Sequence, residues 1–182
     1  MGVIGWPFFS HTSAMLNVRE FEESDSIEEL TSLLHRAYAR LGQMGLNYTA
    51  VDQTAQVTAK RLRGGNCFVV VAESRMIGTI VVQPTYRHSE CAYFTRPGVA
   101  AAHQFAVDPD HQGLGIGRML LPRAEQWAGE SGFSELAMDT AEQATHLIDL
   151  YMRRGYRRVG WVQWSGKVYR SAVLSKRLTA IA

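Results

Sequence analysis

The sequence is short of cysteines and of long apolar segments. Only two of its 182 residues are cysteines, which is too few for a disulfide framework, and no cysteines or histidines repeat at the spacing of metal ligands. The most strongly apolar runs span only a few residues, such as 67–72, so none can cross a membrane as a helix. The N-terminus also lacks the basic segment and the long apolar segment of a signal peptide. We therefore expect a cytoplasmic protein with no metal site and no membrane partner.

The chain also has little net charge. Its 19 basic and 17 acidic side chains leave a formal charge of +2, and the basic residues do not form the stripe typical of proteins that bind nucleic acid. We interpret the small clusters at 60–63 and 153–154 as solvated helix ends. With 46% apolar residues the chain can bury a sizeable core, and its length is typical of one domain. We assign this domain to residues 15–182 and interpret residues 1–14, which show no periodicity, as a flexible extension or an artefact.

Periodic patterns predict alternating strands and helices. Ser26 and Glu29 have the spacing of a capping box, and the apolar residues behind them recur every three or four positions, as in a helix. Gly132 and Gly155 are expected to end two later helices, and Pro122 to kink one. The segment 84–102 is expected to be an irregular link with a functional role. Strands are expected at 16–21, 67–72, 77–82, 103–107, 133–138, 157–164 and 167–178. Helices are expected at 27–41, at 52–63, from the glycine turn to about 130, and at 142–154.

The most informative segment covers residues 107–120. An apolar strand pattern ends at Pro109, and Gly113, Gly115 and Gly117 then precede a helical pattern. Glycine lets main chain approach a ligand closely, and the first turn of a helix offers free N–H groups and a partial positive charge. Together these features predict a cradle for a phosphate or pyrophosphate. A P-loop is excluded because the chain has no Gly-x-x-x-x-Gly-Lys-Ser/Thr run, and a dinucleotide fold is disfavoured because position 118 is not glycine.

The segment Gln112-x-x-Gly115-x-Gly117 resembles the Arg/Gln-x-x-Gly-x-Gly/Ala signature of the GNAT family of N-acetyltransferases. The order of predicted elements resembles that family over residues 15–182. The resemblance implies an α+β (α/β layered) fold, with a mixed, mostly antiparallel twisted sheet of about seven strands and about four flanking helices, in the order β-α-α-β-β-β-α-β-α-β-β. It also implies acetyl-CoA as co-substrate. The implied cofactor-binding residues are Phe105, Ala106, Val107, Gln112, Gly113, Leu114, Gly115, Ile116, Gly117, Arg118, Met119, Ala144, Leu147 and Tyr151.

Residues 150–156 resemble a second segment of that family, Leu/Phe-Tyr-x-x-x-Gly-Phe/Tyr. The resemblance implies that Tyr151 points its hydroxyl at the cofactor sulfur and acts as the general acid. A phenol with a pKa of about 10 can donate to a thiolate with a pKa of about 8.5 while staying protonated at rest. From spacing alone, Tyr151 would be interpreted as a core residue packed with Leu147 and Leu150.

The sequence defines the general base less well. Some relatives that act on arylalkylamines carry a histidine where this chain has His103, and a histidine with a pKa of about 6.5 can accept a proton at neutral pH. A surface histidine at a strand end fits the same pattern. Glu73, Glu90 and His88 are weaker candidates, and many family members use only ordered water. The resemblance also implies that main-chain N–H groups around Val107 hold the acetyl carbonyl.

The acceptor amine is expected to approach from the opposite side. Its walls would come from Gln43, Asn47 and Tyr48, from segment 84–102 and from the closing hairpin. The leading hypothesis is direct acetyl transfer to the primary amine of a small molecule. A protein lysine or N-terminal acetyltransferase and a non-catalytic acyl-CoA-binding sensor or scaffold are alternatives, and a homodimer is common in the family. Aromatic residues that could hold a cationic or aromatic amine, or pack between loop and sheet, are Tyr86, Tyr93, Phe94, Trp161 and Trp164.

Overall fold

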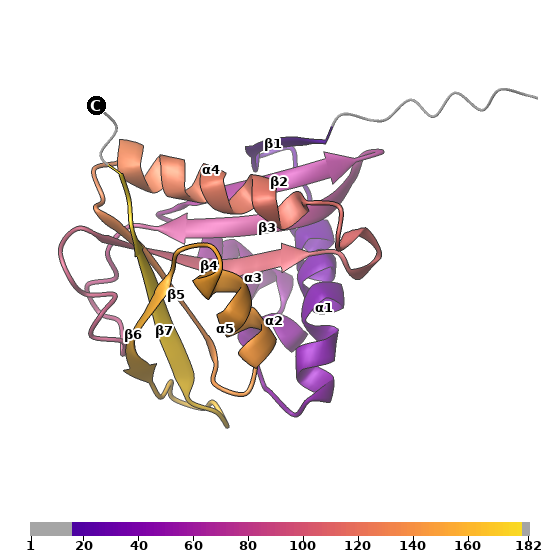
Figure 1. The fold of residues 1–182 in the computed structure, drawn as a ribbon. Coiled ribbons are helices and arrows are strands. Elements are labelled where there is room, and N and C mark those ends of the chain that lie inside the picture. Colours follow the sequence, from indigo (N-terminus) through magenta and orange to yellow (C-terminus); the bar gives the residue numbers. More distant parts are fainter. Residues whose placement is uncertain (1–15, 180–182) are drawn as a thin grey trace, which may run out of the picture.

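The computed structural model describes residues 16–179, which form one mixed sheet of seven strands with helices on both faces (Figure 1). The strand order is β1-β2-β3-β4-β5-β7-β6, and all neighbours are antiparallel except β4 and β5. The predicted α+β fold is confirmed, whereas the prediction for residues 1–14 lies outside the described residues. The strands are β1 (Asn17–Glu20), β2 (Asn66–Ala72), β3 (Arg75–Gln83), β4 (Val99–Val107), β5 (Glu135–Ala141), β6 (Arg157–Val162) and β7 (Ser171–Arg177). The helices are α1 (Ile27–Gln43), α2 (Thr49–Asp52), α3 (Ala55–Leu62), α4 (Ile116–Glu130) and α5 (Thr145–Met152), with a 3-10 turn, η1, at Pro109–His111.

The centre of the sheet is buried on both faces. Side chains alternate between the faces of a strand, so Phe68 and Val70 of β2 join the core beneath α4, while Cys67 and Val69 pack with residues of α1. This double cover explains why β2 and β3 are almost continuously apolar in sequence. None of the helices within residues 16–179 is long and apolar enough to span a bilayer.

Helix α4 lies unusually close to β3 because of Gly78. A Cβ atom at this position would lie 2.5 Å from Cγ2 of Ile116, closer than real Cβ contacts come, and 3.0 Å from Cδ1 of Leu120, which is tighter than most of them. Both Ile116 and Leu120 are fully buried. The absent side chain therefore sets how near the first turns of α4, and the loop that leads into them, can lie to the sheet.

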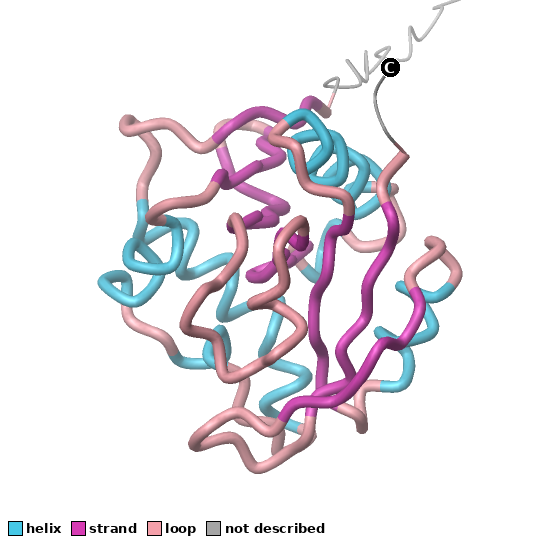
Figure 2. The backbone as a smooth tube through the Cα atoms, turned by 90° about the vertical axis from the view of Figure 1, so that its left-hand side faces the viewer, coloured by secondary structure: helices cyan, strands magenta, loops and turns pink. Residues whose placement is uncertain are grey.

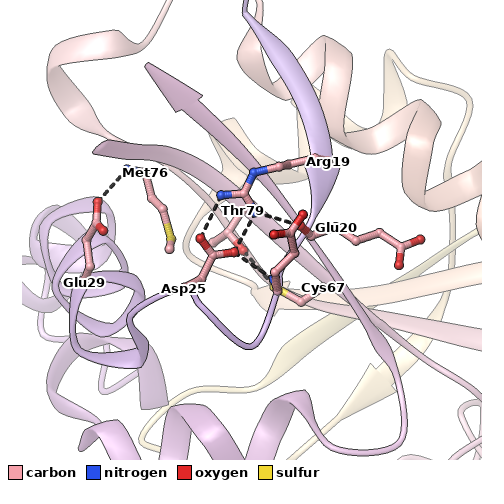
Figure 3. A network of polar contacts seen from close by, with 8 residues as sticks. Arg19, Glu20, Asp25, Glu29, Cys67, Met76 and Thr79 are labelled. Carbon is pink, nitrogen blue, oxygen red and sulfur yellow. Dashed lines mark hydrogen bonds and ion pairs between the residues drawn. The ribbon is translucent and has the colours of Figure 1, made fainter. Parts of the chain in front are cut away.

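The start of α1 is fixed by hydrogen bonds from its first turn (Figure 3). The N–H of Glu29 donates to Oγ of Ser26 at 3.1 Å, as the capping box predicts. The carboxylate of Glu29 does not return to Ser26 but accepts from the main-chain N–H of Met76 at 2.6 Å. Arg19 of β1 and Asp25 form a bidentate pair just before the helix, at 2.6 and 2.7 Å. The first turn of α1 is thus attached to β3, and the chain before it is attached to β1.

Two predicted segments are wrong in their bounds. The helix predicted at 52–63 corresponds to α3, which begins only at Ala55, and the short helix α2 before it was not predicted. The extended backbone of Gln53 separates the two helices, and Oγ1 of Thr54 accepts from the N–H of Val57 at 3.3 Å to begin α3. Strand β4 begins at Val99 rather than at 103, so the irregular link is 84–98. Alanines at 100–102 gave no strand signal, because alanine has low β-propensity.

The C-terminal elements differ from their predicted bounds by a few residues. β5 runs to Ala141, three residues beyond its predicted end, α5 is shorter than predicted at both ends, and the strands β6 and β7 are separated by residues 163–170 rather than by a tight turn. Helix α4 continues through Pro122 to Glu130. The glycines predicted to end helices do so, with φ of +85° at Gly132 and +86° at Gly155.

The parallel pair β4 and β5 is joined over only part of its length. Val99–Ala101 pairs with Glu135–Ala137, and beyond these residues the strands have no ladder. On its other edge, β4 contains one extra residue relative to β3 between the pairs Val81–His103 and Thr79–Ala106, which is a β-bulge. The bulge contains Gln104, with φ of +51°. Segment 84–98, which joins β3 to β4, lies towards the viewer in Figure 2, and its Cys91 and Phe94 pack with Val99 and Ala101 of β4.

Candidate active site

The turn after β4 is attached to α1 through Asp108, which is fully buried. Its carboxylate accepts from Nε of Arg36 at 2.8 Å and from the N–H of Asp110 at 3.1 Å. Burial alone would raise the pKa of Asp108, but these hydrogen bonds and the charge of Arg36 lower it below the usual value. Asp108 is therefore ionised at neutral pH and fixes where the glycine loop begins.

The glycine loop adopts a conformation that only glycine takes readily. Gly113 and Gly115 have φ of +82° and +85°, and Gly115 is the N-cap of α4. The N–H groups of residues 113–117 donate to no group within residues 16–179, while those of Arg118 and Met119 donate to the carbonyl of Gly115 at 2.8 and 3.2 Å. The loop thus presents consecutive free donors at the positive end of a helix, which is an arrangement that binds phosphate groups.

These donors face a cavity of about 900 Å³ between the loop, α1, β4, β5 and α5. All of the residues predicted to bind a cofactor line this cavity except Met119 and Ala144. Ala144 is fully buried as the N-cap of α5, and Met119 lies further along α4. The interpretation of 153–154 as solvated is incomplete, since both arginines also line the cavity. Sequence reasoning missed the contribution of α1, which consists of Arg36, Ala37, Tyr38, Arg40 and Leu41.

Tyr151 lies where this cavity meets a second one. Its side chain is 7% exposed and lines both. Its ring lies 6.2 Å from that of Phe105 and 6.1 Å from that of Tyr156, centroid to centroid, and its hydroxyl forms no hydrogen bond to the described part of the chain. Burial raises the pKa of Tyr151 well above the usual value of a phenol. The hydroxyl is therefore a protonated donor at the junction of two cavities, and no group within residues 16–179 accepts its proton.

The second cavity has a volume of about 470 Å³ and lies on the opposite side of the gap between β4 and β5. Segment 84–98 and the β6–β7 connection form much of its wall, as expected. Asn47 joins the walls, since its Nδ2 donates to the carbonyl of Gly166 at 2.8 Å and its Oδ1 accepts from the N–H of Val168 at 3.0 Å. Of the wall residues proposed from sequence, those that line the cavity are Tyr48, Tyr86, Phe94 and Trp164.

The other two predicted aromatic residues lie elsewhere. Tyr93 donates to the carboxylate of Glu135 at 2.6 Å, and Trp161 packs against the guanidinium groups of Arg158 and Arg170 at 4.9 and 4.3 Å. Neither lines the second cavity. The pattern of aromatic residues along the chain could not separate these roles, because it does not show which face of a loop or strand is enclosed.

Asp139 of β5 is a wall residue that sequence reasoning missed. It lines both cavities, and its Oδ2 accepts from Nε1 of Trp164 at 2.8 Å. Burial raises the pKa of Asp139, while the hydrogen bond from Trp164 acts in the opposite direction. A carboxylate inside an apolar strand could have indicated a functional residue in the sequence. The strand was predicted to end at residue 138, one residue before Asp139, so this signal was missed.

The proposed bases are placed differently from one another. His103 lines the second cavity, and its Nδ1 lies 3.5 Å from an Nη atom of Arg61. Burial and the charge of Arg61 lower the pKa of His103 well below its usual value. His88 and Glu90 also line this cavity, and Glu90 accepts from the N–H and Oγ of Ser165 at 2.8 and 2.9 Å. Glu73 is exposed in the turn between β2 and β3 and lines neither cavity.

Comparisons with known proteins agree with this arrangement. A model of the acetyltransferase (GNAT) family matches residues 22–156. The S-(2-succino)cysteine N-acetyltransferase of Bacillus subtilis (strain 168) is 31% identical over 157 residues, which cover 83% of this chain and 90% of that protein. The ribosomal-protein-S18-alanine N-acetyltransferase from Escherichia coli superposes with a TM-score of 0.69 and 16% identity, over 92% of this chain and 97% of that one. A Bacillus subtilis acetyltransferase in complex with CoA superposes with a TM-score of 0.65 and 20% identity, over 90% of this chain and 99% of that one.

Proposed function

The chain belongs to the acetyltransferase (GNAT) family and is an acyltransferase, and we propose that it transfers the acetyl group of acetyl-CoA to the primary amine of a small molecule. The observation that carries this proposal is the meeting of two cavities at Tyr151. One cavity contains the free donors of the glycine loop, and the other is enclosed by polar and aromatic side chains. The curated relative is named for a small-molecule acceptor, which favours a small molecule over a protein.

Acetyl-CoA would occupy the larger cavity. The N–H groups of residues 113–117 would bind its pyrophosphate, and Arg118 and the arginines at 40, 153 and 154 offer positive charge around the same cavity. A solved structure of the same fold contains CoA. Main-chain N–H groups of β4 near Val107, where the strand has parted from β5, would polarise the acetyl carbonyl as an oxyanion hole does.

The chemistry then follows from the position of Tyr151. The neutral acceptor nitrogen attacks the thioester carbon, the carbon–sulfur bond breaks, and the departing thiolate takes the proton of the Tyr151 hydroxyl. The nitrogen loses a proton as the amide forms, and that proton restores the phenol. Because burial raises the pKa of Tyr151, the phenol stays protonated until a strong acceptor such as a thiolate forms beside it. No protein group within residues 16–179 competes for that proton, since the hydroxyl has no other hydrogen-bond partner there.

The ammonium form of the acceptor must lose a proton before it attacks. We keep His103 as one prediction for the base, but the geometry favours Asp139. A guanidinium can only donate, so the contact between Arg61 and His103 is a hydrogen bond only if Nδ1 accepts. Protonation of that atom would place a cation against Arg61. Asp139 lies at the wall that both cavities share, and because burial raises its pKa, its carboxylate binds a proton more strongly than that of an exposed aspartate.

The decisive experiment follows thiol release from acetyl-CoA by the purified protein, with panels of small amines and of peptides that carry lysine or a free N-terminus. We expect release with small amines, and heat of acetyl-CoA binding in calorimetry without an acceptor. Turnover only with peptides would favour the protein acetyltransferase, and cofactor binding without turnover on any amine would favour the sensor or scaffold. A cytoplasmic location and a homodimer stay predictions.

A further inference from the structure

The second cavity contains a guanidinium group that has no acidic partner. Arg61 lies in the last turn of α3, is half buried and lines the cavity, so its interpretation as a solvated helix end is wrong. None of the ion pairs formed within residues 16–179 includes it. Its Nε donates to Oε1 of Gln104 at 2.9 Å. A partly buried cation normally pairs with an anion, because removal from water is unfavourable for an isolated charge.

Gln104 presents a second donor beside Arg61. Its side chain is only 3% exposed, and because Oε1 accepts from Arg61, the Nε2 group is the end that remains. This Nε2 atom is buried and has no hydrogen-bond partner within residues 16–179. A buried amide without a partner is unfavourable, because it has lost its hydrogen bonds to water and gained none in return. The β-bulge that places this amide in the wall therefore carries a donor that the described part of the chain does not satisfy.

His103 supplies a third donor through its tautomer. Its Nδ1 lies 3.5 Å from an Nη atom of Arg61, which can only donate, and in the tautomer that accepts this contact the ring proton lies on Nε2. The Nε2 atom is also buried and has no partner within the described residues. Three adjacent side chains thus offer N–H groups, and among them the only acceptors, Oε1 of Gln104 and Nδ1 of His103, are both directed at Arg61.

We propose that Arg61, Gln104 and His103 bind a carboxylate of the acceptor, which is therefore an amino-acid-like molecule that carries both an amine and a carboxylate. This inference rests on the proposed acetyl transfer. The flat fork of a guanidinium matches the two oxygens of a carboxylate. The neighbouring amide and imidazole N–H groups add hydrogen-bond donors, which also favour a negatively charged ligand. The cavity's two acids have partners already, since Trp164 donates to Asp139 and Ser165 to Glu90.

The positions of opposite charges in the cavity also suit such an acceptor. Asp139 lies on the wall shared with the larger cavity, next to Tyr151, where the amine must react. Arg61, Gln104 and His103 line the acceptor cavity, and neither Arg61 nor His103 reaches the larger one. An acceptor with its amine near Asp139 and its carboxylate on Arg61 would place each of its charges beside a group of opposite sign.

The test compares matched acceptors in the thiol-release assay. Natural amino acids and S-substituted cysteines are each assayed beside their own carboxamides, and aminoalkyl sulfonates and phosphonates are included as other anions. We expect kcat/KM to be at least tenfold higher for the carboxylate than for the carboxamide of active pairs. Arg61→Gln should reduce that ratio at least tenfold, mainly through the KM of the carboxylate. Lys60→Gln, at an exposed position on the same helix, should leave the ratio unchanged.

A second variant separates charge recognition from folding. Gln104→Glu has nearly the same shape but places a carboxylate against Arg61, so it should reverse the preference towards the carboxamide while acetyl-CoA affinity stays at the wild-type value. If the wild type turned over carboxamides as well as or better than carboxylates, the inference would be overturned, while acetyl transfer itself would stand. A preference for the sulfonate or phosphonate would have the same two consequences. Failure of every amine to release thiol would remove the proposed function and this inference together.

Discussion

Replacement of Tyr151 by phenylalanine removes one hydroxyl from the junction of the two cavities. The ring keeps its contacts with Phe105 and Tyr156, and the hydroxyl has no hydrogen-bond partner within residues 16–179 that would be left unsatisfied. We therefore expect the free energy of unfolding to change by less than about 1 kcal/mol. Acetyl-CoA affinity should also stay nearly constant, because in the proposed complex the pyrophosphate would be held by the glycine loop rather than by α5.

The expected loss is in turnover. A positioned acid contributes roughly 10²- to 10⁴-fold to a rate, but a thiolate with a pKa of about 8.5 can depart in part without a proton. We therefore expect a loss of about tenfold to a hundredfold, which corresponds to about 1.4–2.7 kcal/mol in the activation free energy. Because burial raises the pKa of Tyr151, the phenol stays protonated through moderately alkaline pH. Wild-type turnover should accordingly show no loss from phenol ionisation between about pH 8 and 10.

The assay measures thiol release at saturating acetyl-CoA, together with calorimetric titration of acetyl-CoA. Tyr156→Phe is the matched control, since Tyr156 donates to Glu125 at 3.1 Å, packs edge-on against Tyr151 and lines neither cavity. The control should keep its turnover and lose some stability. If Tyr151→Phe turned over as fast as the wild type, the hydroxyl would not be the acid and departure of an unprotonated thiolate would have to be accepted.

Three further changes test other parts of the site. Gly115→Glu places a strained, negatively charged residue at φ of +85°, so calorimetry should detect no acetyl-CoA binding, and normal titration would contradict the phosphate cradle. Asp108→Asn breaks the buried pair with Arg36 and should lower the free energy of unfolding in urea at pH 7 by about 3 kcal/mol. Since the pKa of Asp108 is lowered on folding, this difference should vanish as pH falls through the folded value, and a constant difference would refute the pair. Asp139→Asn should lower kcat at least tenfold at pH 7 and abolish the decline of wild-type activity on acidification through the raised pKa of Asp139, whereas an unchanged pH profile would return the role of base to His103 or water.

The features predicted well from sequence are those that local rules determine. The helical period of α1, the glycines that end α4 and α5, and the glycine loop itself each depend on residues within one turn or one helix. The burial of β2 on both faces could be inferred because a continuous apolar run has no polar face to expose to water. Errors in bounds arose where local signals were weak, as in the alanines at 100–102 and at Gln53 between α2 and α3.

The polar residues of the acceptor cavity could not be predicted in the same way. Arg61 and Asp139 are far apart in the sequence and meet in one cavity only because the fold makes α3 and β5 part of the same cavity wall. In the sequence, each of these residues is explained without a shared site. A basic residue near the C-terminal end of a helix interacts favourably with the helix dipole, and an acidic residue after a predicted strand is typical of a loop. The glycine loop was recognisable because its donors belong to consecutive residues, whereas the acceptor cavity draws single side chains from several elements.

The β-bulge at Gln104 connects the fold to the chemistry of the acceptor. A non-glycine residue at φ of +51° is unfavourable by about 1–2 kcal/mol, and such backbone strain persists where surrounding contacts hold it. Here the contact is the hydrogen bond from Arg61 to Oε1 of Gln104. The extra residue lies just beyond the last paired residues of β4 and β5, so the place where the strands part is also the place where the buried amide lies. The opening that would admit a thioester and the donors that would select a carboxylate therefore depend on the same residue, so we expect a change of acceptor class to require changes in the sheet as well as in the cavity wall.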